Sequence, residues 1–116
     1  MAENIIRKKS FDFALLIIDL YREIQERHKY VLSKQLLRSG TSIGANVEES
    51  CAGQSRKDFL AKMSIASKKA RETRYWLQLL QQSKIVDVDV TSVLHGANEL
   101  ISILTSIVKT TSEQLK

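Results

Sequence analysis

The sequence contains no proline, and only four of its 116 residues are glycine. Because the tight turns of sandwiches and barrels are usually made by these two residues, their scarcity argues against a β-sheet protein. Aromatic residues are also few, at 6%, yet 43% of the residues are hydrophobic, which is too many for an intrinsically disordered chain. The composition therefore predicts one all-α domain over residues 1–116, a length typical of a single folding unit.

Cysteine is equally scarce, since Cys51 is the only one in the chain. A single cysteine cannot form an intrachain disulfide, and a zinc site needs several ligands at fixed spacings. No apolar run approaches the ~20 residues of a membrane-spanning helix, and residues 1–10 lack the apolar core of a signal peptide. We therefore expect a cytoplasmic protein with no cofactor, no metal and no membrane partner.

The net charge of +5 is concentrated in one stretch, residues 56–74. This stretch has two acidic side chains, Asp58 and Glu72. Its seven basic side chains are Arg56, Lys57, Lys62, Lys68, Lys69, Arg71 and Arg74. A local excess of this kind attracts phosphate groups over a long range, although an ordinary solvated helix face is the alternative.

Apolar residues recur at helical spacing in four segments, which predicts helices over residues 10–27, 32–51, 55–82 and 89–111. Ser10 and Ser55 are the expected N-caps of the first and third helices, and Asp89 or Thr91 that of the fourth. Gly53 is expected to end the second helix in a left-handed conformation. The short connections favour an up-and-down four-helix bundle.

Gly40 and Gly44 lie in the interior of the second predicted helix, where each costs about 1 kcal/mol relative to alanine. Their spacing of four residues places them on one face of the helix. We expect this face to let another backbone approach closely, and a local kink is the alternative.

Two predicted helices carry more apolar surface than one core requires, which favours oligomerisation. In the first helix, two apolar stripes consist of Phe11, Leu15, Ile18 and Tyr21, and of Phe13, Ile17, Leu20 and Ile24. In the fourth helix, the stripe of Val93, Ala97, Leu100, Leu104 and Ile107 is widened by Val90, Leu94, Ile101 and Val108.

The third helix separates into a core stripe, a basic face and an apolar flank. Its predicted core stripe consists of Phe59, Met63, Ala66, Ala70, Thr73, Leu77 and Leu80. The opposite face presents Lys57, Lys68, Arg71 and Tyr75, the candidate surface for a nucleic acid or a protein partner. On one flank lie Ile65, Trp76 and Leu79. Because tryptophan is enriched at interface hot spots, this flank is the candidate subunit contact, and packing within the chain is the alternative.

Residue spacing provides no catalytic constellation. His28 and His95 lack the glutamate three positions earlier that di-iron bundles use, and residues 40–45 do not form a phosphate-binding loop. We therefore expect no enzymatic activity. An enzyme would require Cys51, or the polar residues from Arg38 to Glu49, to converge in a pocket.

Four polar residues of the second helix, Arg38, Ser42, Asn46 and Glu49, recur at spacings of four, four and three and so share one face. Such a row can form a hydrogen-bonded ladder inside the bundle or at an interface, where partly buried polar groups need partners. An ordinary solvated face is the alternative.

Residues 35–50, 54–60 and 65–77 resemble the bacterial four-helix-bundle proteins, which are also called ribosomal RNA intervening-sequence proteins. A relative with the same fold is the accessory variability determinant of diversity-generating retroelements. The shared signature is Arg38, Ser39, Ser42, Ile43, Asn46 and Glu49. The resemblance covers nearly the whole chain and implies an up-and-down bundle that assembles as a homopentameric ring with a central channel.

The basic face and the resemblance together favour a non-enzymatic oligomeric scaffold. Its third-helix face would contact RNA, DNA or a nucleic-acid-processing partner. The retroelement relative binds nucleic acid and docks on a reverse transcriptase, so the resemblance names that enzyme as one such partner. The alternative is a pure protein-interaction module in which the same face binds an acidic protein.

Overall fold

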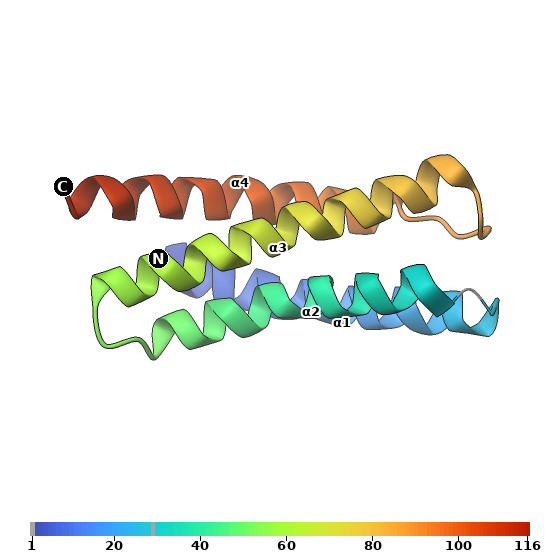
Figure 1. Cartoon of the computed structure of the whole chain (residues 1–116), viewed down its shortest axis with the longest axis horizontal. Coiled ribbons are helices and arrows are strands. Elements are labelled where there is room, and N and C mark those ends of the chain that lie inside the picture. Colours follow the sequence, from blue (N-terminus) through green and yellow to red (C-terminus); the bar gives the residue numbers. More distant parts are fainter. Residues whose placement is uncertain (1, 29) are drawn as a thin grey trace.

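The computed structural model describes residues 2–28 and 30–116. Its helices are α1 (Ala2–Glu26), α2 (Tyr30–Cys51), α3 (Arg56–Ser83) and α4 (Thr91–Gln114). They run antiparallel to their neighbours along the 47 Å length of the molecule, with short connections at both ends (Figure 1). α1 packs against α2 and α4, and α3 packs against the same two helices. The architecture is the predicted up-and-down four-helix bundle.

Each helix contributes one stripe of side chains to the core, and the predicted stripes of α3 and α4 are buried throughout. In α1, the core is formed by the stripe that contains Phe13 and Ile17. The other stripe lies outside, where Phe11 is 63% and Leu15 49% exposed. The bundle therefore needs only one of the two apolar stripes of α1.

The extra apolar residues of α4 are absorbed by the bundle itself. Val90 and Ile101 are buried, and Leu94 and Val108 pack against the core. The expectation that α4 leaves an apolar face for another subunit is therefore wrong. None of the helices described over residues 2–28 and 30–116 is both long enough and apolar enough to cross a membrane.

α1 begins at Ala2, so the prediction of Ser10 as its N-cap is wrong. Ser10 lies inside the helix, 1% exposed, and its hydroxyl donates to the carbonyl oxygen of Arg7 at 3.3 Å. Together with fully buried Ile6, it continues the core stripe toward the N-terminus. A serine in a core position interrupts the apolar periodicity, and it is also a common N-cap residue. Both properties placed the predicted helix start too late.

α1 and α2 approach each other closely at Gly40 and Gly44. A Cβ atom added at Gly40 would lie 2.7 Å from Cγ1 of Ile17, and one added at Gly44 would lie 3.3 Å from the backbone oxygen of Ser10. α2 continues as one helix from Tyr30 to Cys51. The close approach, and not a break in the helix, accounts for the two glycines.

The ends of the helices follow the predictions in part. Ser55 caps α3, because its hydroxyl oxygen accepts the N–H of Asp58 at 3.1 Å. The N-cap of α4 is Val90, so the prediction of Asp89 or Thr91 is wrong by one residue. The Asp89 carboxylate accepts the N–H of Thr91 at 2.9 Å from the position before the cap. The expected left-handed Gly53 is wrong, since none of the four glycines has a positive φ. A Cβ atom at Gly53 would lie 3.2 Å from the carbonyl oxygen of Ser50, so the position needs space.

Candidate nucleic-acid interface

The basic side chains of α3 differ in what they contact. Three of them form ion pairs: Arg56 with Glu3 at 3.3 Å, Lys62 with Glu49 at 2.7 Å, and Lys69 with Glu72 at 3.6 Å. These pairs link α3 to α1 and α2 or lie along α3 itself. Their positive charges are already balanced within the chain.

The other four cations of α3, Lys57, Lys68, Arg71 and Arg74, form no ion pair with any residue of the described ranges. Nη2 of Arg71 donates to Oγ1 of Thr105 at 3.0 Å, and Nη1 of Arg74 donates to Oδ1 of Asn98 at 3.3 Å. Both acceptors are neutral. The contacts orient the two guanidinium groups over α4 without balancing their charge.

These contacts also place Lys109 of α4. α3 and α4 are antiparallel, and Arg71 lies level with Thr105. Lys109 lies one turn after Thr105 in α4, and Lys68 lies one turn before Arg71 in α3. Because the two helices are antiparallel, both steps lead in the same direction along the bundle, so Lys68 and Lys109 lie at the same height. Lys109 is exposed and, among residues 2–28 and 30–116, has no carboxylate partner.

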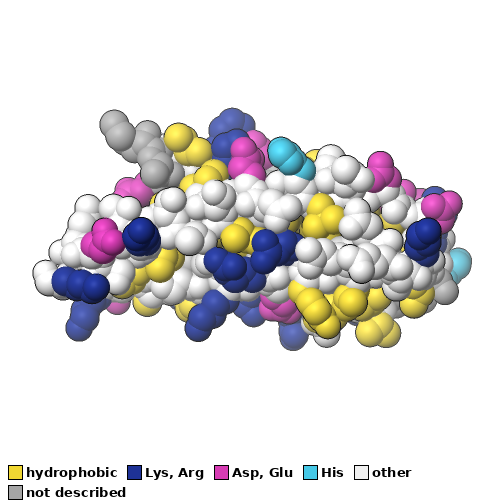
Figure 2. Space-filling view, turned by 90° about the horizontal axis from the view of Figure 1, so that it is seen from above, with side chains coloured by type: hydrophobic (Ala, Val, Ile, Leu, Met, Phe, Trp, Pro, Cys, Tyr) yellow, Lys and Arg dark blue, Asp and Glu magenta, His cyan; other side chains and the backbone are white. Residues whose placement is uncertain are grey.

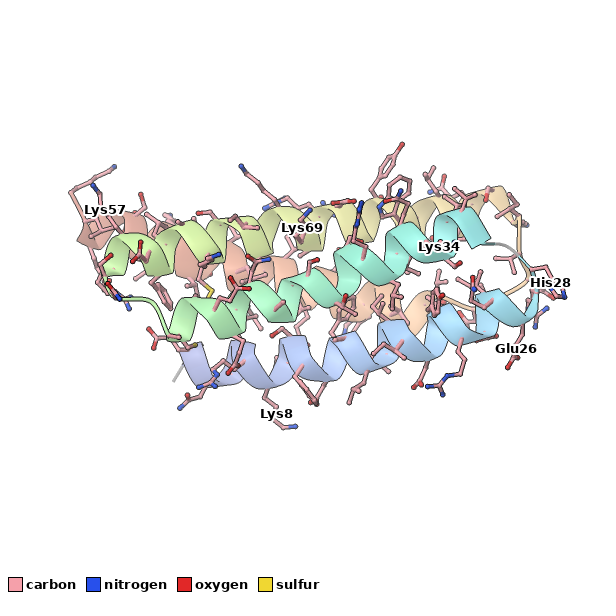
Figure 3. All side chains as sticks on the ribbon, turned by 60° about the horizontal axis from the view of Figure 1, so that its bottom comes forward. Lys8, Glu26, His28, Lys34, Lys57 and Lys69 are labelled. Carbon is pink, nitrogen blue, oxygen red and sulfur yellow. The ribbon has the colours of Figure 1, made fainter. Side chains whose placement is uncertain are left out.

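The five unbalanced cations of α3 and α4, Lys57, Lys68, Arg71, Arg74 and Lys109, are here named the basic surface. Figure 2 shows Lys and Arg side chains gathered over the middle of the face formed by α3 and α4. Lys57 lies apart from this group, at the end of the bundle where α2 leads into α3 (Figure 3).

Sequence reasoning found Lys57, Lys68 and Arg71 but missed Arg74 and Lys109. Arg74 lies nearer to the core stripe, and only its length carries the guanidinium group over α4 to Asn98. Lys109 is isolated in a largely neutral helix. Its place beside Lys68 depends on the alignment of the two helices, which spacing within one helix does not reveal.

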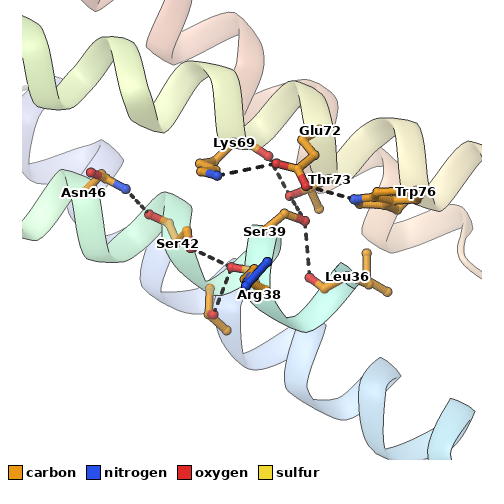
Figure 4. Close-up of polar contacts among 10 residues, drawn as sticks. Leu36, Arg38, Ser39, Ser42, Asn46, Lys69, Glu72, Thr73 and Trp76 are labelled. Carbon is orange, nitrogen blue, oxygen red and sulfur yellow. Dashed lines mark hydrogen bonds and ion pairs between the residues drawn. The ribbon is translucent and has the colours of Figure 1, made fainter. Parts of the chain in front are cut away.

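Two acidic side chains near the middle of the basic surface, Glu99 and Glu72, have partners away from it. Glu99, in the middle of α4, pairs with Lys9 of α1 at 3.2 Å. Glu72 of α3 accepts from Trp76 and pairs with Lys69 on the flank that faces α2 (Figure 4). The middle of the basic surface is thereby left cationic.

Tyr75 lies on the outer face of α3, one turn after Arg71, and is 55% exposed. Its ring meets Trp76 edge to face, with centroids 5.4 Å apart and an interplanar angle of 65°. The indole N–H of Trp76 donates to Oε2 of Glu72 at 3.1 Å. Within this aromatic pair, Trp76 is therefore held in place and Tyr75 is exposed to solvent.

The three residues of the predicted subunit contact, Ile65, Trp76 and Leu79, differ in how far their own chain covers them. Trp76 packs against the core of its own chain, as the alternative interpretation required. Ile65 and Leu79 remain 38% and 37% exposed on the same flank. Sequence spacing located the flank but could not show which of its members the chain itself covers.

The polar row of α2 bonds along its own helix and across to α3 (Figure 4). The Ser42 hydroxyl donates to the carbonyl oxygen of Arg38 at 2.6 Å, and the Asn46 amide donates to that of Ser42 at 2.8 Å. Ser39, 1% exposed, shares a hydrogen bond of 3.0 Å with the hydroxyl of Thr73. Glu49 of the row pairs with Lys62 of α3 at 2.7 Å, so the row borders the α2–α3 contact, and Arg38 at its other end is exposed.

Cys51 is exposed in an open groove of about 460 Å³, at the end of the bundle where α2 leads into α3. The groove is also lined by Arg7, whose pKa is raised by its 2.8 Å hydrogen bond to Glu48 and by the carboxylate charge. Among the described residues that line the groove there is no histidine to act as a base for Cys51. Within residues 2–28 and 30–116, no three His, Cys, Asp or Glu side chains cluster as metal ligands would.

Comparison with known proteins places this bundle in a family. No curated protein matches the chain. A crystal structure from Bacteroides thetaiotaomicron VPI-5482, of a protein with unknown function from the S23 ribosomal protein family, is 44% identical with a TM-score of 0.87. The match covers 94% of this chain and 99% of that one. A family model described as 23S rRNA-intervening sequence protein matches residues 2–106, and the chain therefore belongs to the 23S rRNA-intervening sequence protein family.

Proposed function

We propose that the protein is a non-enzymatic, homo-oligomeric scaffold of the cytoplasm that contacts nucleic acid through the basic surface. The observation that carries this proposal is the sorting of cations on α3. Lys62 and Lys69 are paired with carboxylates, whereas Lys68, Arg71 and Arg74 have no carboxylate partner in the part of the chain that the structure describes. Cations that no carboxylate balances can neutralise phosphates and release the counterions of a nucleic acid.

Self-association is supported by apolar side chains that the bundle leaves uncovered. Phe11 and Leu15, here named the α1 patch, are exposed on α1. Ile65 and Leu79, here named the α3 patch, are exposed on α3. If the α1 patch of each subunit contacts the α3 patch of the next, the contact is heterologous, and such contacts form a ring when the rotation between subunits closes.

The family resemblance implies five subunits in that ring. A homopentamer would carry a net charge of about +25, five times that of one chain. Five copies of a modest site would also gain avidity for a long polyanion. The same surface would serve for docking on a nucleic-acid-processing enzyme such as a reverse transcriptase.

Salt dependence of binding tests the proposal. Fluorescently labelled RNA and DNA are titrated with the protein at about 50 mM and about 200 mM salt, and binding is followed by anisotropy. We expect affinity to fall steeply between the two conditions because counterions are released. An affinity that does not change with salt, or no binding to either nucleic acid, would contradict the proposal.

Two variants of equal charge change locate the site on α3. Lys68→Gln with Arg71→Gln removes two cations of the basic surface, and Lys62→Gln with Lys69→Gln removes two that are ion-paired. We expect the first double variant to weaken binding and flatten its salt dependence much more than the second. Labelled polyglutamate is the probe for the alternative function. Binding of polyglutamate as tight as that of RNA would favour an acidic protein partner instead.

A further inference from the structure

Tyr75 places an exposed aromatic ring among the cations of the basic surface. At 100° and 1.5 Å per residue, it lies about 40° around the helix and about 6 Å along it from Arg71. Lys68 lies about 20° around the helix and about 10 Å along it from Tyr75. The ring and the two cations therefore form one row on the outside of α3.

The ring is also held in place. Its edge-to-face contact with Trp76 braces one side, at a centroid distance of 5.4 Å. Trp76 is in turn fixed by its hydrogen bond to Glu72 and by the core. Tyr75 nevertheless remains 55% exposed. A ring that is already positioned loses little conformational entropy when a ligand stacks on it.

The neighbouring cations are positioned in the same way. Arg71 is tied to Thr105 and Arg74 to Asn98, so both guanidinium groups are directed along the α3–α4 face. Phosphates of a strand that follows this face would meet prearranged donors, as expected for a backbone-tracking surface.

Building on the proposed function, we infer that this row binds single-stranded nucleic acid in preference to duplex, with an unpaired base stacked on Tyr75 and adjacent phosphates on Lys68 and Arg71. A duplex presents phosphates outward and keeps its bases stacked on each other, so Tyr75 has no base face to contact there. A single strand offers both groups at once. Proteins that bind single strands without sequence preference combine basic grooves with aromatic stacking in this way.

RNA and DNA single strands share this chemistry, and the experiment includes both. A labelled single strand of about 20 nucleotides, as RNA and as DNA, is compared with the same strand annealed to its complement, at low salt. The proteins are the full chain, Tyr75→Leu, Tyr75→Phe and Tyr21→Leu. The last variant makes the same change on α1, which does not pack against α3.

We expect the unmodified protein to bind the single strand several-fold more tightly than the duplex. Tyr75→Leu should weaken single-strand binding about 5-fold or more, the lower end of what one stacked base contributes, and change duplex binding less than about 2-fold. Tyr75→Phe should retain the preference, because its ring still stacks, and Tyr21→Leu should leave it unaltered. Emission of Trp76, the only tryptophan, should change on binding of the single strand because its ring contacts Tyr75.

The outcomes separate this inference from the proposed function. If the duplex binds as tightly as the single strand and Tyr75→Leu changes neither, the inference is overturned while the proposed function stands. If neither form binds, both are overturned. Light scattering is measured for every variant. If Tyr75→Leu breaks the assembly apart, Tyr75 is a subunit contact and the stacking role is wrong.

Discussion

The side chain of Ile17 on α1 occupies the space that a side chain at Gly40 on α2 would need. A Cβ atom at Gly40 would lie 2.7 Å from Cγ1 and 2.8 Å from Cγ2 of Ile17, which is fully buried. Neither atom is at the end of a long side chain that could swing away. This contact sets how closely α1 and α2 approach.

Gly40→Ala is expected to destabilise the bundle although alanine favours helices. The propensity gain is about 1 kcal/mol, and overpacking of a filled core costs about 1–3 kcal/mol, so the net loss should be up to about 2 kcal/mol. The measurement is the free energy of unfolding in urea. In an Ile17→Ala background the clash is absent, and the same change should there stabilise the protein by up to about 1 kcal/mol. An additive double-mutant cycle would contradict this account.

The buried hydroxyl pair of Ser39 and Thr73 leads to a second prediction. Thr73→Val keeps the shape of the side chain but removes the 3.0 Å hydrogen bond to Ser39, which retains only a long contact of 3.5 Å to the carbonyl oxygen of Leu36. We expect a loss of about 1 kcal/mol in the free energy of unfolding.

The double variant Ser39→Ala with Thr73→Val provides the control. It removes both partners together, so no buried hydroxyl is left poorly bonded, and its cost should be smaller than the sum of the two single changes. A double variant as costly as that sum would show that the two hydroxyls act independently.

The core of α3 could be predicted residue by residue, because an uninterrupted stripe from Phe59 to Leu80 follows the helical period and Ser55 caps it. The start of α1 could not. Ser10 lies where the backbone of α1 approaches Gly44 of α2, and sequence periodicity does not contain that contact between helices. The prediction for Gly53 was wrong for a related reason, because this position lacks room for a side chain and does not adopt a left-handed backbone conformation.

In the candidate site, only the arrangement of residues along a single helix could be predicted from the sequence. Lys68, Arg71 and Tyr75 share a face by spacing alone. Charge counting could not separate Lys69, which Glu72 balances, from Lys68, which has no carboxylate partner among the described residues. Which cations are free depends on the side chains of the neighbouring helices, and this information comes from the packing.

Lys109 provides a direct test of the surface that spans α3 and α4. Lys109→Gln should weaken nucleic-acid binding about as much as Lys68→Gln and lower the salt slope by about 0.7–0.9, the value for one lost phosphate contact. Lys34→Gln is the matched control, since Lys34 is an exposed lysine on α2. Equal effects of Lys109→Gln and Lys34→Gln would indicate attraction by net charge without a defined surface.

The start of α4 should be sensitive to acid. Hydrogen bonds from the side chain and the backbone N–H of Thr91 lower the pKa of Asp89 below its ordinary value of 3.8. Because the folded state favours the carboxylate, its stabilising contribution is present above that ordinary value and is lost as the pH falls through the lower, folded pKa. Asp89→Ala should therefore lower the melting temperature more at pH 7 than near pH 2. A difference that stays constant from pH 7 to pH 2 would show that the charge of Asp89 has no part in it.

The proposed ring predicts an outcome that a symmetric dimer formed by the α1 patch pairing with itself does not. Phe11→Glu damages the α1 patch and Leu79→Glu the α3 patch, and each change alone should break the assembly into smaller species in size-exclusion light scattering. Mixed together, the two variants still have one intact patch of each kind, on different chains. A heterologous contact then forms once per pair, and the mixture should yield dimers. If Leu79→Glu leaves the assembly intact while Phe11→Glu breaks it, the α1 patch pairs with itself and the ring is not the assembly.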